Sequence, residues 1–355
     1  MSAEAPVLPE HLGRFAAGRG KIQRWPDIQG VNPMEIGYRN VILQPRPGTT
    51  IETRREPDPS VRLGRLNLRY PVIASNMKSV VGDPRAVEAF HKVGMVAATY
   101  PYQDVDYHAR VCYDFTRRGV QAIYSVRMRH AEDDAARLIG AGASVILIDT
   151  AHGGMEQVIR RATAIKDAHS DIPDLTLIAG NITTYDQAQA YAESGVIDIA
   201  RVFVGPGEGC RTKMKTGVGT PGEISAIYDM HGWLKIIADG GIKEPGDVPK
   251  ALAAGAEFVM IGSMFAGTEE SGMESLANGK RAFYGEASEH AMRERGIRPD
   301  EFRGPEGAYL EIDDRGTVQD AAWEITRGLR SAMSYVGAHT MEEFRQNAVF
   351  AYYHH

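Results

Sequence analysis

The amino-acid sequence predicts a single (β/α)8 (TIM) barrel domain over residues 1–355, and three observations predict it. Eight short apolar runs recur along the chain. Segments with helical patterns separate the runs, and several of these segments end in Gly directly before the next run, as helices commonly do. Gly-rich turns follow the sixth, seventh and eighth runs. An open doubly wound sheet is the alternative, but its Gly-rich turn usually follows the first strand.

The eight apolar runs are the predicted strands. They are rich in β-branched residues and almost continuously hydrophobic, as parallel strands buried on both faces should be. Eight strands that alternate with helices are expected to close into a barrel. The runs span residues 71–77, 95–100, 122–126, 145–151, 175–181, 199–207, 235–241 and 258–263.

The segments outside this rhythm have separate predictions. Residues 1–68 are rich in Pro, Arg and Gly and are expected to wrap the outside of the barrel irregularly. Residues 265–317 are too long for one loop, which predicts a flap insertion after the eighth strand. Residues 320–338 carry an amphipathic pattern and are predicted to form a closing helix.

Composition narrows the class of protein. The chain has 43% hydrophobic residues and a formal net charge of −6, which argues against nucleic-acid binding. Two cysteines argue against a disulfide scaffold and favour a reducing, cytoplasmic compartment. No apolar run resembles a signal peptide or is long enough to span a membrane, so no membrane partner is expected.

Active sites of such barrels lie at the carboxyl ends of the strands. Gly240 and Gly241 end the seventh strand, and Gly262 and Ser263 end the eighth. Open backbone N–H groups at these two turns predict a phosphate site, and the alternative is that they are ordinary turn glycines. Asp239 is expected either to bind a ribose diol or to cap the following helix.

Cys210 is the candidate nucleophile. It lies in a glycine loop with Arg211, Lys213 and Lys215 close in sequence, and positive charge favours the reactive thiolate. The alternative is an inert buried cysteine, which is the prediction for Cys112.

Two further residues are candidates for acid–base chemistry. Thr212 follows two residues after Cys210, and Glu306 lies in the predicted flap. Both are expected to act near the atom that Cys210 attacks. The alternative for Glu306 is an ordinary solvated loop carboxylate.

Three stretches resemble one known family. Residues 205–221, GPGEGCRTKMKTGVGTP, closely resemble the cysteine loop of the IMP dehydrogenase/GMP reductase family. Residues 236–272 resemble its phosphate region, and residues 325–338 resemble its closing helix. The resemblance extends over most of the chain and implies the same barrel fold.

Within that family, the resemblance favours the GMP reductase branch. The chain has no room for the regulatory domains that many IMP dehydrogenases insert. Glu311 stands where the flap Arg of an IMP dehydrogenase is expected, and residues 302–307, FRGPEG, resemble the reductase segment with the catalytic glutamate. An NAD-dependent IMP dehydrogenase and a non-catalytic purine-nucleotide sensor are the alternatives.

The resemblance implies that the Cys210 thiolate attacks C2 of a guanine-type base. Thr212 and Glu306 then help the amino group leave as ammonia, and NADPH supplies hydride. A homotetramer and a potassium ion are also implied. Implied substrate contacts are Met77, Asp239, Gly240, Gly241, Gly262, Ser263, Gly285, Arg303 and Gly307. Implied cofactor contacts are Asp149, Asn181, Lys78 and Tyr100, and carbonyls of Gly205, Gly207 and Cys210 are implied for the cation.

The chain departs from the family pattern near these contacts. Lys78 replaces an acidic residue, and Tyr100 stands where reductases have Lys. Glu208-Gly209, Arg211 and Glu286-Ala287 also replace smaller or apolar residues. These changes motivate a hypothesis that the substrate is a modified guanine nucleotide, such as a 7-deazaguanine nucleotide. The alternative is a divergent GMP reductase in which Lys78 takes the place of the missing lysine.

Overall fold

The computed structural model describes residues 14–17, 21–24, 36–273, 275–301 and 304–353. Of the predicted site residues, only Arg303 lies outside these described residues. Among the helices of the described part, none has both the length and the apolar character needed to cross a membrane.

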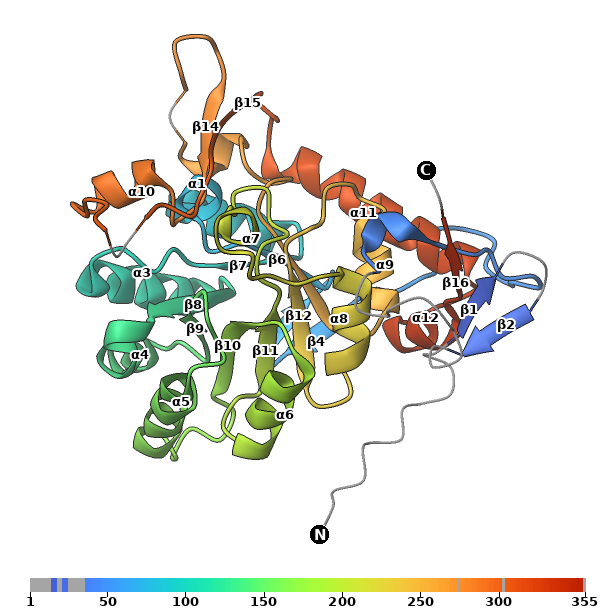
Figure 1. The fold of residues 1–355 in the computed structure, drawn as a ribbon, viewed down its shortest axis with the longest axis horizontal. Coiled ribbons are helices and arrows are strands. Elements are labelled where there is room, and N and C mark those ends of the chain that lie inside the picture. The colour runs from blue at the N-terminus through green and yellow to red at the C-terminus, as the bar shows by residue number, and fades with distance from the viewer. Residues whose placement is uncertain (1–13, 18–20, 25–35, 274, 302–303, 354–355) are drawn as a thin grey trace.

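Eight parallel strands close into a barrel, which confirms the predicted fold and excludes the open sheet (Figure 1). Each strand pairs with the next along the chain, and the last pairs with the first. The strands are β6 (Val72–Ala74), β7 (Val96–Ala98), β8 (Ala122–Arg127), β9 (Val145–Asp149), β10 (Thr176–Ile182), β11 (Ile199–Val202), β12 (Lys235–Asp239) and β13 (Phe258–Ile261).

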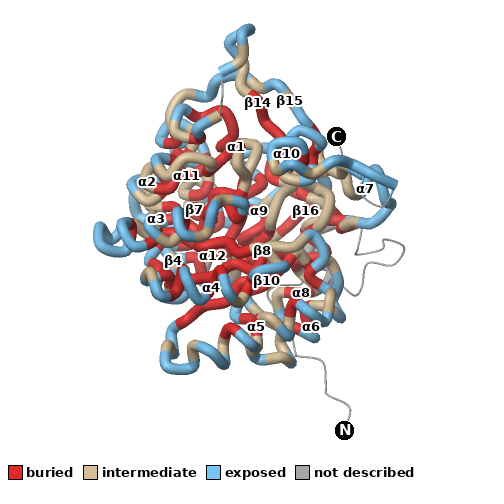
Figure 2. Tube along the Cα trace, turned by 90° about the vertical axis from the view of Figure 1, so that its left-hand side faces the viewer, coloured by how far each residue is buried: buried red, intermediate tan, exposed pale blue. Residues whose placement is uncertain are grey.

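The apolar runs lack alternation because both faces of each strand are buried. Leu147 of β9 packs inside the barrel with Ile73 and Ile178, whereas its neighbours Ile146 and Ile148 pack against the outer helices. The two faces therefore belong to two separate apolar cores. Figure 2 shows this buried centre beneath helices whose outer faces are exposed.

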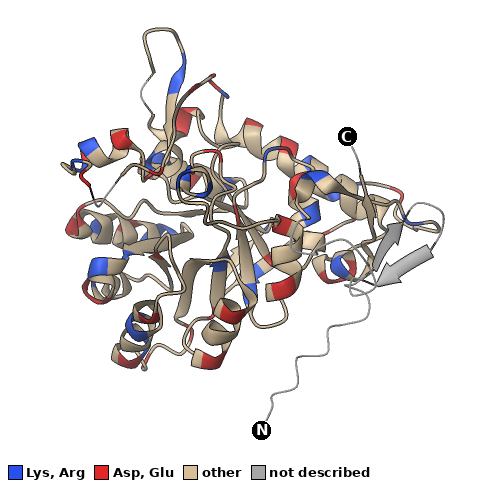
Figure 3. Cartoon of the chain, in the orientation of Figure 1, with Lys and Arg blue, Asp and Glu red and all other residues tan. Residues whose placement is uncertain are grey.

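Helices follow most of the strands and cover the outside of the barrel (Figure 1). Asp104 and Thr184 cap the starts of two of them, and Gly119 and Gly195 end the same two in the left-handed conformation predicted for a helix end. Figure 3 shows acidic and basic residues interspersed on these helices. The helices are α1 (Lys78–Val81), α2 (Pro84–Lys92), α3 (Val105–Arg118), α4 (Ala131–Gly140), α5 (Glu156–Ala168), α6 (Tyr185–Ser194), α7 (Thr212–Thr216), α8 (Glu223–Met230), α9 (Asp247–Ala253), α10 (Glu289–Glu294), α11 (Val318–Tyr335) and α12 (Met341–Asn347).

A hairpin closes one end of the barrel. Strands β4 (Val61–Leu63) and β5 (Leu66–Leu68) pair, and their three leucines join the core inside the barrel. A Cβ atom on Gly64, in the turn, would lie 2.2 Å from the hydroxyl of Thr176 at the start of β10. The hairpin therefore covers the amino ends of the strands and leaves the carboxyl ends open for a site.

The described part of residues 1–68 thus contains regular structure where an irregular wrap was predicted. Besides the hairpin, β3 (Val41–Leu43) pairs with β16 (Phe350–Tyr352) near the other end of the chain. Two further strands, β1 (Arg14–Ala17) and β2 (Lys21–Arg24), complete a small sheet in the order β2-β1-β16-β3. This sheet lies outside the barrel (Figure 1).

The insertion after β13 is a two-stranded ribbon with a helix. Strands β14 (Arg281–Tyr284) and β15 (Tyr309–Ile312) are antiparallel, and α10 lies between them in sequence. The ribbon projects from the barrel beside α1 (Figure 1). The helix that follows, α11, is the predicted closing helix.

Candidate active site

A cavity of about 490 Å³ opens at the carboxyl ends of the strands and is roofed by the flap. Its wall contains most of the predicted site residues, although Lys78 and Tyr100 are not among those that line it. The predicted residues in the wall are Met77, Asp149, Asn181, Gly205, Gly207, Cys210, Thr212, Asp239, Gly240, Gly241, Gly262, Ser263, Gly285, Glu306 and Gly307.

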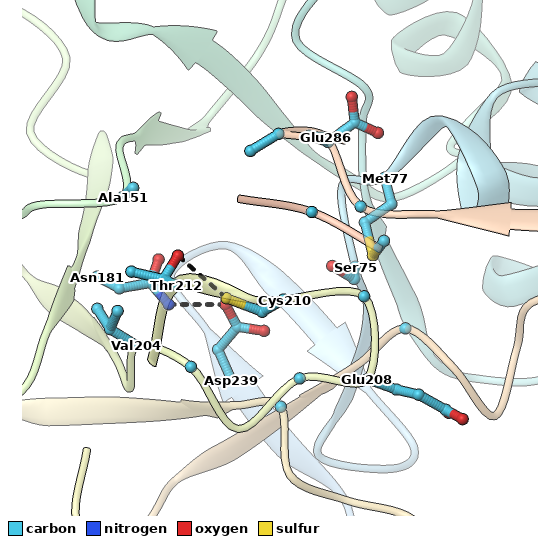
Figure 4. Close-up of a pocket in the computed structure, with 18 of the residues that line it drawn as sticks. Ser75, Met77, Ala151, Asn181, Val204, Glu208, Cys210, Thr212, Asp239 and Glu286 are labelled. Carbon is cyan, nitrogen blue, oxygen red and sulfur yellow. Dashed lines mark hydrogen bonds between the residues drawn. The ribbon is translucent and has the colours of Figure 1, made fainter. Parts of the chain in front are cut away.

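Cys210 lies in the loop after β11, and its side chain is half-buried in the cavity wall. The loop is held locally because the Cys210 amide donates to the Gly207 carbonyl at 2.9 Å. The Cys210 sulfur lies 3.4 Å from the hydroxyl of Thr212 (Figure 4). The pairing predicted from a two-residue spacing is therefore present in space.

Two of the three basic residues after Cys210 make their side-chain contacts elsewhere than at the thiol. The Arg211 guanidinium lies 3.6 Å from the sulfur of Met214, and the Lys213 ammonium lies 3.4 Å from the Thr220 carbonyl. Neither lines the cavity. By contrast, Cys112 is fully buried, and burial raises the pKa of its thiol, as expected for an unreactive cysteine.

The flap backbone lies directly against the cysteine loop. The Arg211 amide donates to the Glu306 carbonyl at 2.7 Å, and the Ala308 amide donates to the Gly209 carbonyl at 2.9 Å. The Ala308 carbonyl in turn accepts from the Gly285 amide at 2.9 Å. Residues 306–308 thus form a middle strand between the cysteine loop and the turn after β14.

Glycine is required where these segments meet. A Cβ atom on Gly285 would lie 2.1 Å from the Gly209 carbonyl oxygen, well inside contact distance. A Cβ atom on Gly307 would lie 2.3 Å from the Ser288 amide nitrogen. The close backbone packing makes Glu306, which is half-buried, part of the same cavity wall as Cys210 and Thr212.

Arg201 on β11 is a site residue that sequence reasoning missed. Its guanidinium is 4% exposed, forms an ion pair with Asp149, and lies 3.6 Å from the Asp239 carboxylate. It also donates to the Asn76 side chain at 3.1 Å. The signal was an arginine inside an otherwise apolar strand, since a buried charge requires partners.

Asp239 belongs to the same polar network. Its carboxylate accepts a hydrogen bond of 2.9 Å from the Asn181 amide (Figure 4). Burial raises the pKa of Asp239, and the charge of Arg201 and the Asn181 hydrogen bond partly offset that effect. The helix-cap alternative is wrong because the next helix, α9, begins only at Asp247 with Gly246 at its cap.

Phe203 begins the cysteine loop in an unusual conformation. Its φ is +94°, a region that non-glycine residues rarely occupy, and its side chain is fully buried. The Phe203 amide donates to Ile182 at 2.8 Å, and its carbonyl accepts from Asn181 at 2.6 Å. These bonds hold a backbone geometry that costs on the order of 1–3 kcal/mol.

The glycine turns after β12 and β13 bring three loops together. Gly240 has φ +93°, and a Cβ atom there would lie 3.3 Å from Gly207. A Cβ atom on Gly262 would lie 3.0 Å from the sulfur of Met77. Turn geometry and close packing already account for these glycines. Phosphate binding at the two turns therefore stays a prediction.

The two acidic residues that depart from the family pattern, Glu208 and Glu286, differ in burial and in orientation. The Glu208 side chain is exposed and points away from the Cys210 sulfur (Figure 4). Glu286 is mostly buried in the cavity wall, and its carboxylate accepts from the Lys78 amide at 2.7 Å and from Arg295 at 3.0 Å. Burial raises the pKa of Glu286 to about 7. Sequence reasoning had no signal for its partner Arg295.

The predicted cofactor contacts divide into two groups. Asp149 and Asn181 lie in the cavity wall, where an amide and a carboxylate suit a carboxamide or a ribose hydroxyl. The Lys78 ammonium instead forms an ion pair of 2.9 Å with Glu294, and Tyr100 is buried and does not line the cavity. Cofactor contacts by Lys78 and Tyr100 stay predictions.

Comparison with known proteins gives the family. The model of the IMP dehydrogenase / GMP reductase domain matches residues 35–354. The chain belongs to this family. It is 42% identical over 233 residues to an inosine-5'-monophosphate dehydrogenase of Streptococcus pyogenes, which is 61% of this chain and 46% of that protein. It is also 38% identical over 247 residues to an inosine-5'-monophosphate dehydrogenase of Halalkalibacterium halodurans, and the match covers 65% of this chain and 48% of that protein.

A third relative, from Staphylococcus aureus and also named inosine-5'-monophosphate dehydrogenase, is 40% identical over 233 residues, covering 61% of this chain and 46% of that protein. The chain spans less than half the length of each of these relatives. The family is thereby established as an oxidoreductase family of purine nucleotide metabolism, whereas the GMP reductase branch is not distinguished by these matches.

Glu311, which stands where an IMP dehydrogenase is expected to have its flap Arg, lies on β15 and outside the cavity wall. Its carboxylate accepts from the Asn278 side chain at 2.8 Å on the exposed ribbon β14–β15. It does not line the cavity. The features that favour one reaction must therefore be sought in the cavity wall itself.

Proposed function

We propose that the protein catalyses NADPH-dependent reductive deamination of a guanine-type purine nucleotide through a covalent bond to Cys210. One observation carries the proposal: the Cys210 sulfur lies 3.4 Å from the Thr212 hydroxyl, and Glu306 lines the same cavity beneath the flap. A nucleophile, a hydroxyl and a carboxyl group together supply attack on C2 and proton delivery to its leaving group.

The residues of this chain would act in a fixed order. The Cys210 thiolate adds to C2 of the base, and the C2–N3 π electrons move to N3. Glu306 protonates the 2-amino group, directly or through the Thr212 hydroxyl, and ammonia leaves as the C=N bond re-forms. When bound, NADPH supplies the hydride that C2 accepts. The carbon–sulfur bond then breaks, which restores the thiolate and gives the hypoxanthine-type nucleotide.

The polar network of β11 would orient the two ligands. Arg201 fixes Asp149 and Asp239, and Asn181 links Asp239 to the Phe203 carbonyl. A carboxylate held this way accepts hydrogen bonds from ribose hydroxyls or from a carboxamide without having to reorganise. The site thus supplies fixed acceptors on the side of the cavity opposite the flap.

The described cavity wall offers no unpaired arginine that could serve as a base for hydrolysis. Hydrolysis of a covalent adduct needs a base that activates water, and an arginine serves only when it is not paired. The two arginines in the described part of the wall are both paired, Arg201 with Asp149 and Arg295 with Glu286. Neither is available for that task.

NAD-dependent oxidation of IMP is the second candidate function. The observation that favours it is the name of the relatives, which are 38–42% identical to this chain and are called inosine-5'-monophosphate dehydrogenases. It would use the same Cys210 attack on C2, with hydride leaving rather than arriving.

One set of assays tests both candidates. Purified protein would be incubated with NADPH and GMP, or with NADPH and a 7-deazaguanine nucleotide, while NADPH absorbance, ammonia and product mass are followed. We expect NADPH oxidation with one ammonia released per turnover, and Cys210→Ala should abolish it. The relative rates on GMP and the 7-deaza nucleotide decide whether the base is modified.

Other outcomes would overturn the proposal. Oxidation of IMP with NAD, assayed in the same way, would identify the second candidate function instead. Tight GMP binding without turnover under any condition would identify a sensor, and full activity of Cys210→Ala would exclude the covalent step. The assay repeated in potassium and in sodium tests the cation proposed for the carbonyls of Gly205, Gly207 and Cys210. Light scattering tests the proposed homotetramer.

A further inference from the structure

The carboxylate of Glu286 accepts hydrogen bonds from both the barrel and the flap. One of its oxygens accepts from the backbone amide of Lys78, the first residue of α1. The other accepts from the guanidinium of Arg295, which follows α10 in the flap. Arg295 also donates to the Glu286 carbonyl, so side chain and backbone are held by the same partner.

The next residue along holds Glu306 in place. The Ala287 carbonyl accepts from the Glu306 amide at 2.9 Å and from the Gly307 amide at 3.0 Å. The same Glu306 peptide is bonded on its other side to the cysteine loop through the Arg211 amide. The turn that contains Glu286 therefore forms the outer of three backbone segments, and the cysteine loop forms the inner one.

Glu286 does not act on the reacting atoms itself. Its carboxylate points away from the Cys210 sulfur (Figure 4). The described structure gives its carboxylate two hydrogen-bond partners, the Lys78 amide and Arg295. A mostly buried carboxylate is retained at a cost in solvation, which these contacts offset only while it stays in this place.

We propose that Glu286 is a positioning residue that fixes the turn of residues 285–288 against the barrel and thereby sets Glu306 opposite Cys210 and Thr212. The kinetic part of this inference rests on the proposed function. The structural part, that Glu286 holds residues 306–308 over the cysteine loop, is independent of the proposed function.

Two substitutions and one control test the structural part. Glu286→Met removes both acceptors, and Glu286→Gln keeps an acceptor but removes the charge. Glu294→Gln is the matched control, because the Glu294 carboxylate also bridges α1 and the flap, and its hydrogen bonds in the described structure go to Lys78 and Tyr284 and not to the turn. Folding of each variant would be checked by circular dichroism, and Glu286→Gln carries the test if Glu286→Met does not fold.

The readouts are hydrogen exchange at the amides of Arg211, Gly307 and Ala308, and the rate at which iodoacetamide alkylates Cys210, measured on its peptide. We expect both rates to rise about tenfold in Glu286→Met and less in Glu286→Gln, because loss of one buried anchor opens a local segment. Wild-type rates in both Glu286 variants, or an equal rise in Glu294→Gln, would overturn the inference.

Kinetics separate this inference from the proposed function. If wild-type protein deaminates a guanine nucleotide, Glu286→Met should lower kcat about tenfold and raise KM for the nucleotide by less, since the wall residues at the ends of β12 and β13 keep their places. A raised KM with unchanged kcat would show that Glu286 binds substrate instead of positioning Glu306. If wild-type protein has no such activity but exchange and alkylation rise as expected, the proposed function fails and the positioning role stands.

Discussion

Phe203 shows how a single residue stores strain beside the nucleophile. At φ +94° a Cβ atom is unfavourable, so glycine should be preferred to alanine here, the reverse of the usual order. We expect Phe203→Gly to be more stable than Phe203→Ala by about 1–2 kcal/mol, because both lose the buried ring and only alanine keeps the strain. Denaturant unfolding of the pair checks this, and a more stable alanine variant would contradict it.

Glu286 gives a pH dependence with a definite sign. Its pKa is raised by burial from 4.5 to about 7 in the folded protein, so the folded state holds the proton more tightly. Its contribution to stability is full below about pH 4.5 and is lost as pH rises through 7. Relative to Glu286→Gln, the wild-type protein should lose on the order of 1–3 kcal/mol between pH 5 and 8.

Thermal unfolding of both proteins across that range measures the difference. A constant gap between the two curves would show that the carboxyl keeps the same charge in both states. Comparison with Glu286→Gln is necessary because Asp229, with a pKa of about 6 through burial, titrates in the same range in both proteins.

Among single residues, the sequence predicted those site residues that lie at or just after the carboxyl end of a strand. Asp239 and the glycines end predicted strands and Cys210 follows one, so a barrel brings them to one rim. Arg201 and Arg295 were missed because their roles depend on partners that are distant in sequence, Asp149 for one and Glu286 for the other. No local pattern encodes such pairs.

Among the elements, the flap depends on backbone contacts that leave no room for side chains. A Cβ atom on Gly285 would lie 2.1 Å from the Gly209 carbonyl oxygen. We expect Gly285→Ala to separate residues 306–308 from the cysteine loop and to speed Cys210 alkylation about tenfold, because overpacking costs about 1–3 kcal/mol. Gly304→Ala is the control in the same flap, since a Cβ atom there meets nothing within 4 Å.

The alkylation rate of Cys210 in the two glycine variants decides the point. Equal rates in Gly285→Ala and Gly304→Ala would mean that the turn yields without disturbing the cysteine loop. Circular dichroism would confirm that both variants retain the barrel.

The elements that were predictable differ from those that were not in the range of their contacts. Each barrel strand lies largely within one continuous apolar run, and such runs are recognisable in the sequence. Strands β3, β4 and β5 are three residues long, and β3 finds its partner β16 at the other end of the chain. Short strands with a distant partner carry too little periodicity to be recognised from sequence.

For the whole molecule, the two ends of the barrel have separate tasks. The β4–β5 hairpin fills the amino end with leucines, whereas the carboxyl end holds the polar cavity. The fold follows from patterns repeated eight times along the chain, so it tolerates individual departures. These patterns identify the family, whereas the matches do not distinguish its two branches.

This division predicts that stability and chemistry can be changed independently. Leu63 is fully buried in the hairpin, and Leu63→Ala should lower the free energy of unfolding by about 2–5 kcal/mol through the cavity that it leaves. Cys210 alkylation and any kcat should stay within about twofold of wild type, because the change lies at the opposite end of the barrel. Denaturant unfolding and alkylation of the same preparation measure both. A large rise in Cys210 reactivity would show that the amino-end core sets the geometry of the distant rim, and the two ends would then have to be treated as one cooperative unit.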